Sequence, residues 1–600
     1  MTTARPSPGE PAELDALLAR AVGHHRAGRL DEAATAYGEI LTLRPDIAEV
    51  HCNLGVILKG QGRLDEAVAR YQHAIALKPE FVEAYNNLGN ALREQGKPDQ
   101  AAARYRQAIA LRPQYAEAHN NLGIILFHED KLDQAVAQYE QALALKPDLA
   151  EAHNNLGNAL KRQGKFDQAA ARFEHAIALW PDYAEAHCNL GNVLLGQGKP
   201  DEATERYERA LALRPDYAEA LCNLGHALMQ LGEHDRALAR LEHALALDPD
   251  YADAHKNLGS TLLDQLKLPA AREAFGRLRA LRPDSIDAHV GLATCYFLEG
   301  DYERAWPAYE GRMQMAKLGP LLDRPRWTGE PLAGRSLLLV TEQGLGDTLQ
   351  FVRFARVLKE QGARVVLACP PAVGRLLASY PDLDELFVLG SAAELPLTDY
   401  YLPLLSVPGV LGTTVSSIPA RVPYLLADAE LIDRWRRELA SVDGFKIGIV
   451  WQGARDYSSD RWRSIPLSQF APLARLPGVR LISLQKGFGA EQIAAVGFPV
   501  LDLSDRLDVT AGPFMDTAAV IQNVDLVVTP DTAIGHLAGA LGAPIWLALQ
   551  FSPNWRWLLG RDDSPWYPIV RLFRQTDSGG WPDVFERIAN AVQACRAEIG

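Results

Sequence analysis

The second half of this 600-residue chain contains three polar loops, and each follows directly on a run of apolar residues. The loops read EQGLGDT at 342–348, WQGARDYSSDRWRSIP at 451–466 and TPDTAIGHLAG at 529–539. They supply a carboxylate, several arginines and a glycine-bearing helix start. Such groups take part in proton transfer and in binding phosphate oxygens, so these loops are the first candidates for a functional site.

Asp347 in the first loop stands where a helix is expected to begin. A carboxylate there can accept a proton from a substrate, but aspartate is also a common cap of a helix N-terminus. Arg463 in the second loop can hold a diphosphate, because a guanidinium group matches phosphate oxygens and stays charged. A solvated basic loop is the alternative for Arg463. The residues alone leave both questions open.

The third loop runs from a strand into a helix of small residues. Thr532 and the first amides of that helix predict an anion site, which the helix dipole strengthens, and Gly535 permits close approach of a ligand. Helix capping by Asp531 and packing of the glycine are the alternative. The compact sequence D-T-A-I-G-H, which ends at His536, favours phosphate binding.

The three loops need strands to position them, and the chain beyond residue 335 supplies these. Apolar runs alternate with amphipathic segments, which predicts parallel sheets covered on both faces. The first series is followed by a helix near 429–439, so we expect two lobes with the ligand beyond the carboxyl ends of their strands. The expected strands are 336–341, 363–370, 385–390, 446–453, 479–485, 525–530, 543–549 and 568–573, with a helix at 348–360 after the first.

The first half of the chain repeats every 34 residues. Proline recurs from Pro45 to Pro283, glycine from Gly55 to Gly259 and alanine from Ala33 to Ala305, with an aromatic residue usually four positions after the alanine. Small residues let two helices approach and proline ends the second helix, which is the tetratricopeptide signature. The sequence therefore predicts an α-solenoid of about nine repeats over residues 14–319.

One asparagine precedes the Leu-Gly pair of each repeat. Its position on the first helix predicts a row of amides lining a groove, able to bond the backbone of an extended peptide. The alternative is that each asparagine bonds the neighbouring helix. The segments NNLGNAL at 86–92 and 154–160 resemble the repeats of O-GlcNAc transferase, which implies binding of a protein acceptor by Asn87, Asn121, Asn155, Asn189, Asn223 and Asn257.

Composition excludes several classes of protein. A formal net charge of -14 argues against a surface built for nucleic acid or anionic lipid, and no stretch has the apolar length of a membrane span. Six cysteines without a CxxC pair indicate neither a zinc knuckle nor a disulfide framework. Histidines at one register of the repeats lie too far apart to share a metal ion. We therefore expect a cytoplasmic protein without a metal site.

The motifs G-L-G-D and D-T-x-x-G-H, with R-S-I-P between them, resemble those of family 9 glycosyltransferases, the heptosyltransferase-like enzymes of GT-B fold. The resemblance covers about residues 335–600. It implies two Rossmann-like lobes, at 335–430 and 445–600, the second binding a nucleotide-sugar. The fusion to repeats is similar to bacterial repeat-glycosyltransferases, some of which modify flagellin.

The resemblance also implies roles for single residues. Asp347 matches a proposed catalytic base, and Arg463 stands where the family has a lysine near the donor phosphates. The other donor-binding candidates are Asp531, Thr532, Gly535, His536, Gln485 and Lys486.

The function expected is therefore metal-independent, inverting sugar transfer from a nucleotide-sugar substrate, with no cofactor, to a protein acceptor. An inactive scaffold and a transferase acting on a glycan or lipopolysaccharide are the alternatives. The sugar, the nucleotide, the acceptor and the oligomeric state stay open.

Overall fold

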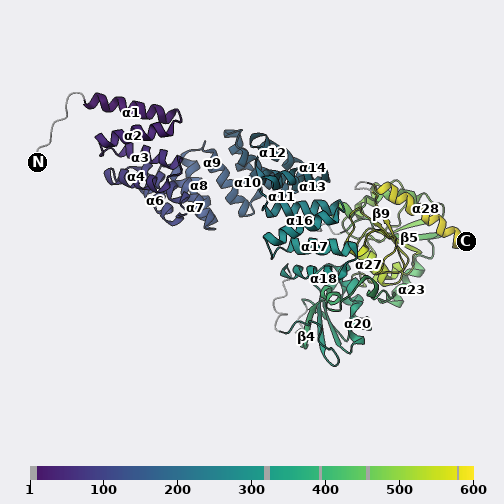
Figure 1. Ribbon diagram of the computed structural model, residues 1–600. Helices are drawn as coiled ribbons and strands as arrows, with labels where there is room; N and C mark the ends of the chain where they lie inside the picture. The colour runs from purple at the N-terminus through teal and green to yellow at the C-terminus, as the bar shows by residue number, and fades with distance from the viewer. Residues whose placement is uncertain (1–9, 316–323, 391–394, 454–459, 577–579, 600) are drawn as a thin grey trace. The chain divides into compact units, whose positions relative to one another are not determined.

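The structure is a computed structural model that describes residues 10–315, 324–390, 395–453, 460–576 and 580–599. The chain divides into two compact units, an N-terminal unit of residues 1–233 and a C-terminal unit of residues 234–600 (Figure 1).

The N-terminal unit is built of helices alone in the part that the structure describes, and successive helices pack in pairs. Five first helices carry a glycine that lies against the aromatic ring of the second helix, namely Gly55, Gly89, Gly123, Gly157 and Gly191. A Cβ on Gly89, for example, would lie 2.5 Å from the ring of Tyr105. The helices are α1 (Glu10–Arg26), α2 (Leu30–Leu43), α3 (Ala48–Gly60), α4 (Leu64–Leu77), α5 (Val82–Glu94), α6 (Pro98–Leu111), α7 (Ala116–His128), α8 (Leu132–Leu145), α9 (Ala150–Arg162), α10 (Phe166–Leu179), α11 (Ala184–Gly196), α12 (Pro200–Leu213) and α13 (Ala218–Leu231).

The repeated histidines have a structural role in these helices. His51 Nε2 lies 2.9 Å from the carbonyl oxygen of Pro45, and the same bond recurs at His119, His153 and His187 in later repeats. Each ring stabilises the turn that precedes its helix, because its nitrogen is a hydrogen-bond partner for a proline carbonyl oxygen that lies outside the helix.

The C-terminal unit begins with helices that continue the repeat pattern, so the unit boundary differs from the domain boundary expected near residue 320, which lies outside the described residues. Phe297 stacks on Trp555, a residue of the α/β part, at a centroid distance of 4.0 Å, and Trp306 donates a hydrogen bond of 2.8 Å to the carbonyl of Thr413. These aromatic contacts place the last repeats in the core of this unit. The helices are α14 (His234–Leu247), α15 (Ala252–Asp264), α16 (Leu268–Leu281), α17 (Ile286–Glu299) and α18 (Tyr302–Tyr309), followed by the 3-10 turn η1 (Glu310–Met315).

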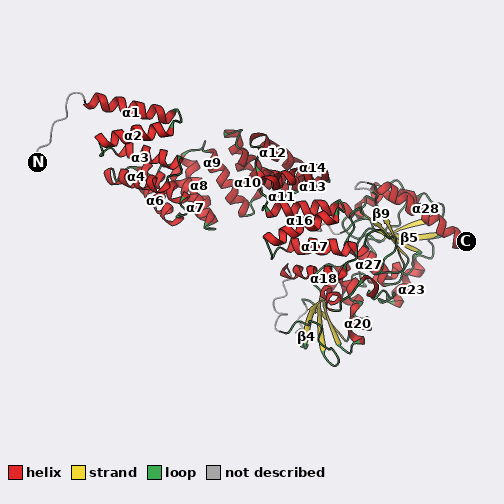
Figure 2. Cartoon of the chain, in the orientation of Figure 1, coloured by secondary structure: helices red, strands yellow, loops and turns green. Residues whose placement is uncertain are grey.

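Two parallel sheets follow, and the strands in Figure 2 are confined to them. The first sheet has the order β3-β2-β1-β4 and the second the order β6-β5-β7-β8-β9, with every pair parallel. The strands are β1 (Ser336–Val340), β2 (Arg364–Cys369), β3 (Glu385–Val388), β4 (Tyr400–Pro403), β5 (Phe445–Ile449), β6 (Val479–Ser483), β7 (Leu526–Thr529), β8 (Ile545–Leu549) and β9 (Val570–Arg574).

The eight strands expected from the sequence are confirmed, and β4 was missed. Its sequence YYLP is short and ends in proline, so it lacks the apolar run that marks a buried strand. The helix expected at 348–360 is broken into α19 and α20 at Val352 and Arg353. The helices are α19 (Leu345–Phe351), α20 (Phe354–Glu360), α21 (Pro371–Leu377), α22 (Val407–Val410), α23 (Ala429–Glu438), α24 (Asp460–Arg463), α25 (Ala471–Ala474), α26 (Met515–Ile521), α27 (Ala533–Ala540) and α28 (Trp581–Ile599), and the 3-10 turns are η3 (Leu404–Ser406), η4 (Val415–Ser417), η5 (Leu467–Phe470), η6 (Ala490–Ala495) and η7 (Trp555–Trp557).

Strand order reverses between β1 and β4 in the first sheet and between β5 and β7 in the second. In open parallel sheets a ligand binds beyond the carboxyl ends of the strands at such a reversal. The loop 341–344 follows β1, and the loops that begin at Val450 and Pro530 follow β5 and β7. The fold therefore puts all three polar loops at the edges where ligands bind.

Candidate functional site

A cavity of about 500 Å³ lies at the carboxyl ends of β5, β6 and β7. Its volume falls within the range of small-molecule sites. Three strand-end loops and the segment before α26 contribute its wall. The lining residues are Val450, Gln452, Gly453, Leu484, Gln485, Lys486, Asp508, Pro513, Phe514, Thr517, Thr532, Ala533 and Ile534.

The start of α27 forms one wall of this cavity. Thr532 is the residue before the helix, and Ala533 and Ile534 are its first two residues. Their backbone N–H groups precede the first bond within the helix, which His536 N makes to Thr532 O at 3.3 Å. Unpaired amides and the positive end of a helix dipole favour an anion, so this wall suits phosphate oxygens.

Gln485 and Lys486 line the cavity but are bonded within the protein. Gln485 Oε1 accepts from the backbone N–H groups of Trp451 and Gln452, at 3.3 and 3.1 Å, and its Nε2 donates to a carbonyl at 2.9 Å. Lys486 Nζ donates to the carbonyls of Leu507 and Asp508, at 2.7 and 3.3 Å. Both side chains thus tie the loops of the wall to one another.

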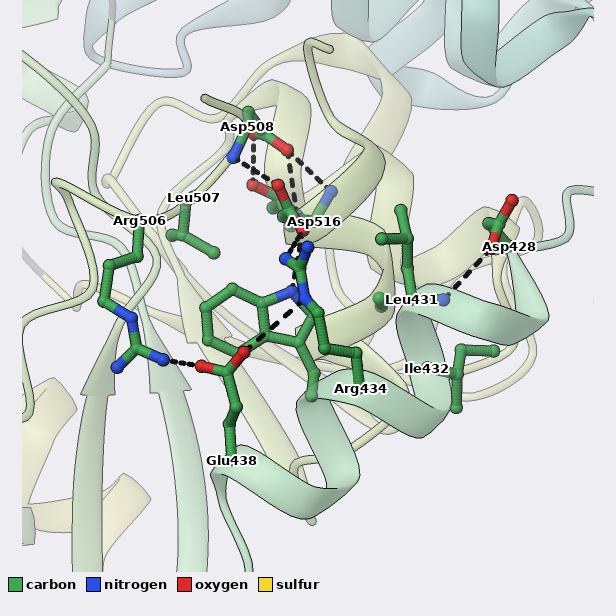
Figure 3. Close-up of polar contacts among 12 residues, drawn as sticks. Asp428, Leu431, Ile432, Arg434, Glu438, Arg506, Leu507, Asp508 and Asp516 are labelled. Carbon is green, nitrogen blue, oxygen red and sulfur yellow. Dashed lines mark hydrogen bonds and ion pairs between the residues drawn. The ribbon is translucent and has the colours of Figure 1, made fainter. Parts of the chain in front are cut away.

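The segment before α26 is held by a buried carboxylate that sequence analysis did not single out. Asp516 is fully buried, and it accepts from Arg434 and from the indole Nε1 of Trp435, the latter at 2.8 Å. Asp508 Oδ1 accepts hydrogen bonds from the backbone N–H groups of Asp516 and Thr517, at 2.8 and 3.1 Å (Figure 3). This network fixes Asp508 and Thr517 in the cavity wall.

Arg463 lies behind the wall and is absent from the lining. Its Nη1 donates to the carbonyl of Asp531 at 3.1 Å, and its Nε donates to Asp460 at 3.0 Å. A Cβ on Gly453 would lie 2.4 Å from Arg463 Nη2, so only glycine lets the guanidinium pack here. Residues 454–459 of the same polar loop lie outside the described residues.

Asp531 and His536 face each other beneath the start of α27. Asp531 Oδ1 lies 3.6 Å from His536 Nε2, while His536 Nδ1 is 3.0 Å from the hydroxyl of Tyr567. Burial by itself would raise the pKa of Asp531, but the hydrogen bond and charge of His536, with Arg556 and Arg463, hold it below its usual value. Asp531 is therefore a carboxylate that orients the histidine.

Gly535 does not reach the cavity. A Cβ there would lie 3.2 Å from the side chain of Leu547 and 3.7 Å from that of Ile545, so the glycine packs α27 against β8. At Gly535 the structure therefore shows the packing contact that the sequence left as the alternative.

Asp347 uses both carboxylate oxygens. Its Oδ2 accepts from the backbone N–H of Gly344 at 3.1 Å, which caps the first turn of α19, and its Oδ1 accepts from Arg556. Arg556 is almost fully buried, and it also donates to Gln350 at 2.7 Å and to Asn554 at 2.9 Å. The Asp347 side chain keeps 20% exposure, so a ligand can still reach it.

The first and third loops lie directly against each other. A Cβ on Gly346 would be 2.9 Å from His536 Cδ2 and 3.5 Å from the Cα of Ala533. Gly346 precedes Asp347, and Ala533 lines the cavity. The turn that carries Asp347 is thus packed on the helix that forms the anion-binding wall.

A second buried carboxylate stands at the start of the first loop. Glu342 Oε1 accepts from Arg312 at 3.0 Å and from the backbone N–H of Leu405 at 3.3 Å, whereas its Oε2 is buried without a hydrogen bond from any described residue. Burial raises the pKa of Glu342, with Arg312 opposing the shift and Asp347 adding to it. Arg312 belongs to η1, so the segment after the last repeat reaches this loop.

The repeated asparagines donate hydrogen bonds inside the N-terminal unit. Nδ2 of Asn121 lies 2.9 Å from Asn86 Oδ1, and Asn155 and Asn189 make the same bond one repeat further on, at 3.0 Å each. Asn87 donates to the sulfur of Cys52, Asn223 donates to Asn192 at 2.8 Å, and Asn257 is buried in the C-terminal unit. The amide nitrogens thus bond the neighbouring helix, while the five side chains other than Asn257 stay partly exposed.

Sequence analysis missed Arg556 and Gln350, which surround Asp347. Arg556 follows β8 in the segment NWRW, so the rule that strand-end loops hold the site also points to it. Neither Arg556 nor Gln350 belongs to the motifs G-L-G-D, R-S-I-P or D-T-x-x-G-H. Within the described ranges no group of three or more histidine, cysteine, aspartate or glutamate side chains could hold a metal ion, and no helix is long and apolar enough to cross a membrane.

The repeat array defines the class of the first part of the chain. Sequence models described as tetratricopeptide repeats match residues 14–39, 57–96, 86–150, 148–216, 194–259 and 256–312. These segments are tetratricopeptide repeats, of the kind that binds other proteins.

A curated relative is Protein FlbA of Caulobacter vibrioides (strain ATCC 19089 / CIP 103742 / CB 15), which is 30% identical over 342 residues. The match covers 50% of this chain and 54% of the relative, so the chain spans about half the length of that relative.

Solved structures similar to the chain include the Cut9-Hcn1 hetero-tetramer of APC/C, at 21% identity and TM-score 0.39, over 46% of this chain and 55% of that one. PilF of Pseudomonas aeruginosa is 25% identical at TM-score 0.32, over 34% and 94%. YrrB, described as a TPR protein with an unusual peptide-binding site, is 23% identical at TM-score 0.27, over 32% and 97%.

Proposed function

We propose that the C-terminal unit is a glycosyltransferase of GT-B type, and that it transfers a sugar from a nucleotide-sugar to a protein acceptor. The observation that carries the proposal is the cavity at the carboxyl ends of β5, β6 and β7, with the start of α27 as its anion-binding wall and the turn of Asp347 packed on that helix. A donor phosphate beside Thr532 would lie close to the carboxylate that acts on the acceptor.

In the proposed reaction Asp347 accepts a proton from an acceptor hydroxyl while the oxygen attacks the anomeric carbon. The carbon–oxygen bond to the nucleotide breaks in the same step, which inverts the configuration. The amides of Ala533 and Ile534, with the dipole of α27, stabilise the charge on the departing phosphate. Arg463 adds positive charge from behind Gly453.

Arg556 gives the proposed base its position. Because three of its contacts are to Asp347, Gln350 and Asn554, the guanidinium fixes the carboxylate against α27. The same pair also supports the alternative of an inactive scaffold, since a carboxylate that caps its own helix and binds an arginine has a sufficient structural role without catalysis.

The donor site is tested by thermal-shift measurements of the full chain with ADP-, UDP-, GDP- and CMP-sugars. A ligand that binds only the folded state raises its stability, so one nucleotide class should raise the melting temperature. Thr532→Ala should abolish the shift, because it removes a side chain of the anion-binding wall. Shifts of equal size for Thr532→Ala and the unmodified chain would contradict the site.

We propose that the repeats hold the protein acceptor, with flagellin as the first acceptor to test because of the family resemblance. The amide nitrogens of the asparagine row are bonded within the unit, so the carbonyl oxygens are left to accept backbone N–H groups of a peptide. Asn121→Ala with Asn155→Ala should lower transfer to protein and spare transfer to a soluble sugar.

Asn158→Ala is the matched control for this double variant. It lies one turn along α9 from Asn155, and its register partners Asn90 and Asn192 accept from tyrosine hydroxyls. Transfer to protein that is unchanged in the double variant would favour the alternative of a glycan acceptor.

A further inference from the structure

Ion pairs recur along the repeats in one register. Each joins an acidic residue near the start of a first helix to a basic residue that follows the second helix, 29 positions later. The pairs are Glu49–Lys78 at 2.8 Å, Glu83–Arg112 at 2.7 Å, Glu117–Lys146 at 3.1 Å and Glu185–Arg214 in the N-terminal unit, and Asp253–Arg282 at 2.8 Å in the C-terminal unit.

In three of these pairs the cation also covers an aromatic ring. Lys78 Nζ lies 5.1 Å from the ring centre of Phe81, and the guanidinium carbon of Arg214 lies 4.9 Å from that of Tyr217. Arg112 has the same relation to the tyrosine three residues after it, at 5.5 Å. In these three repeats the cation is thus shared between a carboxylate and a ring, which is a favourable arrangement at a surface.

The repeat formed by α9 and α10 breaks this pattern, because Trp180 stands at the position of the cation. The acidic residue, Glu151, and the aromatic residue, Tyr183, are both present. Trp180 stacks on Tyr183 at a centroid distance of 4.6 Å and an interplanar angle of 22°. The indole is 46% exposed, so its outer face is open.

Although the charge of Lys146 acts on it, Glu151 lacks the ion pair of its register within the part of the chain that the structure describes. Its side chain is exposed, and it makes no ion pair with any residue within the described ranges. The nearby acids differ, since Asp182 pairs with Arg209 at 3.1 Å and Glu185 pairs with Arg214. Burial raises the pKa of Tyr183 to about 12, and the charges of Glu185 and Glu151 add to the shift, which places both carboxylates near the ring.

We propose that Glu151 and the outer face of Trp180 form a binding site for a lysine or arginine side chain of a partner protein. The cation of the partner would restore the pair that the five repeats named above make within the chain. Tryptophan is the aromatic side chain that binds cations best, and the carboxylate supplies the opposite charge. Leu179 beside it is 39% exposed and adds an apolar contact for the same partner segment.

The test uses the full chain labelled with 5-fluorotryptophan, and the fluorine signal of Trp180 is assigned by its loss in Trp180→Phe. The probes are N-acetyl-arginine amide and its neutral analogue N-acetyl-citrulline amide. We expect the arginine probe to shift the Trp180 signal in a saturable manner, and the citrulline probe to leave it unchanged because citrulline carries no charge.

Variants decide whether the carboxylate takes part. Glu151→Gln should weaken binding of the arginine probe roughly fivefold, the factor that corresponds to about 1 kcal/mol for an exposed ion pair. Glu83→Gln is the matched control and should leave binding unchanged, since that carboxylate already pairs with Arg112. No shift with arginine, an equal shift with citrulline, or unchanged binding in Glu151→Gln would each overturn the proposal.

Discussion

Replacing Arg556 by alanine should disable the candidate active site while the cavity keeps its ligand. The change removes hydrogen bonds to Asp347, Gln350 and Asn554. Loss of one partner of a buried pair costs about 3–5 kcal/mol, and the 20% exposure of Asp347 puts the expected loss of stability near the lower end, about 3 kcal/mol. Gln350 is fully buried and loses the only acceptor bond of its Oε1 within the described residues.

The effect on turnover follows from the position of the carboxylate. With Arg556 absent, Asp347 keeps only the bond from Gly344 among the bonds within the described residues, so it is free to rotate away from α27. A displacement of about 1 Å costs roughly 100-fold in rate, so kcat should fall by about this factor while the KM for the donor changes little. Release of nucleotide from the donor, followed over a range of donor concentrations, separates the two constants.

Arg574→Ala is the matched control for Arg556→Ala. Arg574 is also largely enclosed and donates to the carbonyl of Trp557, but it has no contact with Asp347 among its described bonds. We expect low concentrations of guanidinium to restore part of the activity of Arg556→Ala and none of that of Arg574→Ala. An Arg556→Ala protein with normal kcat, or equal losses in both variants without rescue, would refute the positioning role.

Three further changes test the packing and the charges. Gly346→Ala should lower stability by about 1–3 kcal/mol and reduce donor turnover, because its Cβ would lie 2.9 Å from the ring of His536; unchanged denaturant unfolding and turnover would be inconsistent with the close packing of the two loops. Gly89→Ala should cost a similar amount in the repeats, and circular dichroism melting of the full chain would detect it, since a Cβ there would meet a buried aromatic ring. Hydrogen bonds from the hydroxyl and backbone N–H of Ser336, and then from Arg335, lower the pKa of Asp399 to about 2. The ionised Asp399 therefore stabilises the fold fully above about pH 4, and this stabilisation is lost as the pH falls toward 2. The difference in unfolding free energy between the unmodified chain and Asp399→Asn should shrink over that interval, and a constant difference would contradict this role of Asp399.

The repeats could be predicted in detail because each position of the 34-residue period has one structural cause. The Gly89 contact with Tyr105 recurs at Gly55, Gly123, Gly157 and Gly191, so the spacing alone identifies both partners. The direction of the Asn121 side chain was harder to predict. Helix geometry puts the Asn121 side chain on an open face, but its amide nitrogen donates to Asn86 on the first helix of the preceding repeat. Helix periodicity does not show whether that nitrogen bonds a peptide or the neighbouring helix, whereas the folded structure does.

The candidate site could be predicted only where a motif is local in sequence. Thr532 lines the cavity as its place before a helix predicts, whereas Gly535 faces the sheet, because one turn of helix separates the two sides of α27. Arg556 lies 209 residues from Asp347, and no spacing rule links them. The contacts of the last repeats with the α/β part could not be predicted for the same reason, since Phe297 and Trp555 are far apart in sequence and stack only in the folded unit.

The most direct test of the account is turnover of nucleotide-sugars by the purified full chain. ADP-, UDP-, GDP- and CMP-sugars are each incubated with the chain and an extract that supplies protein acceptors, and nucleotide release and the mass of the acceptor proteins are measured. The account predicts release from one donor class with a matching gain in acceptor mass, both lost in Asp347→Ala. Release that persists at the full rate in Asp347→Ala, or its absence with all four donors, would contradict the assignment of this unit as a transferase that uses Asp347.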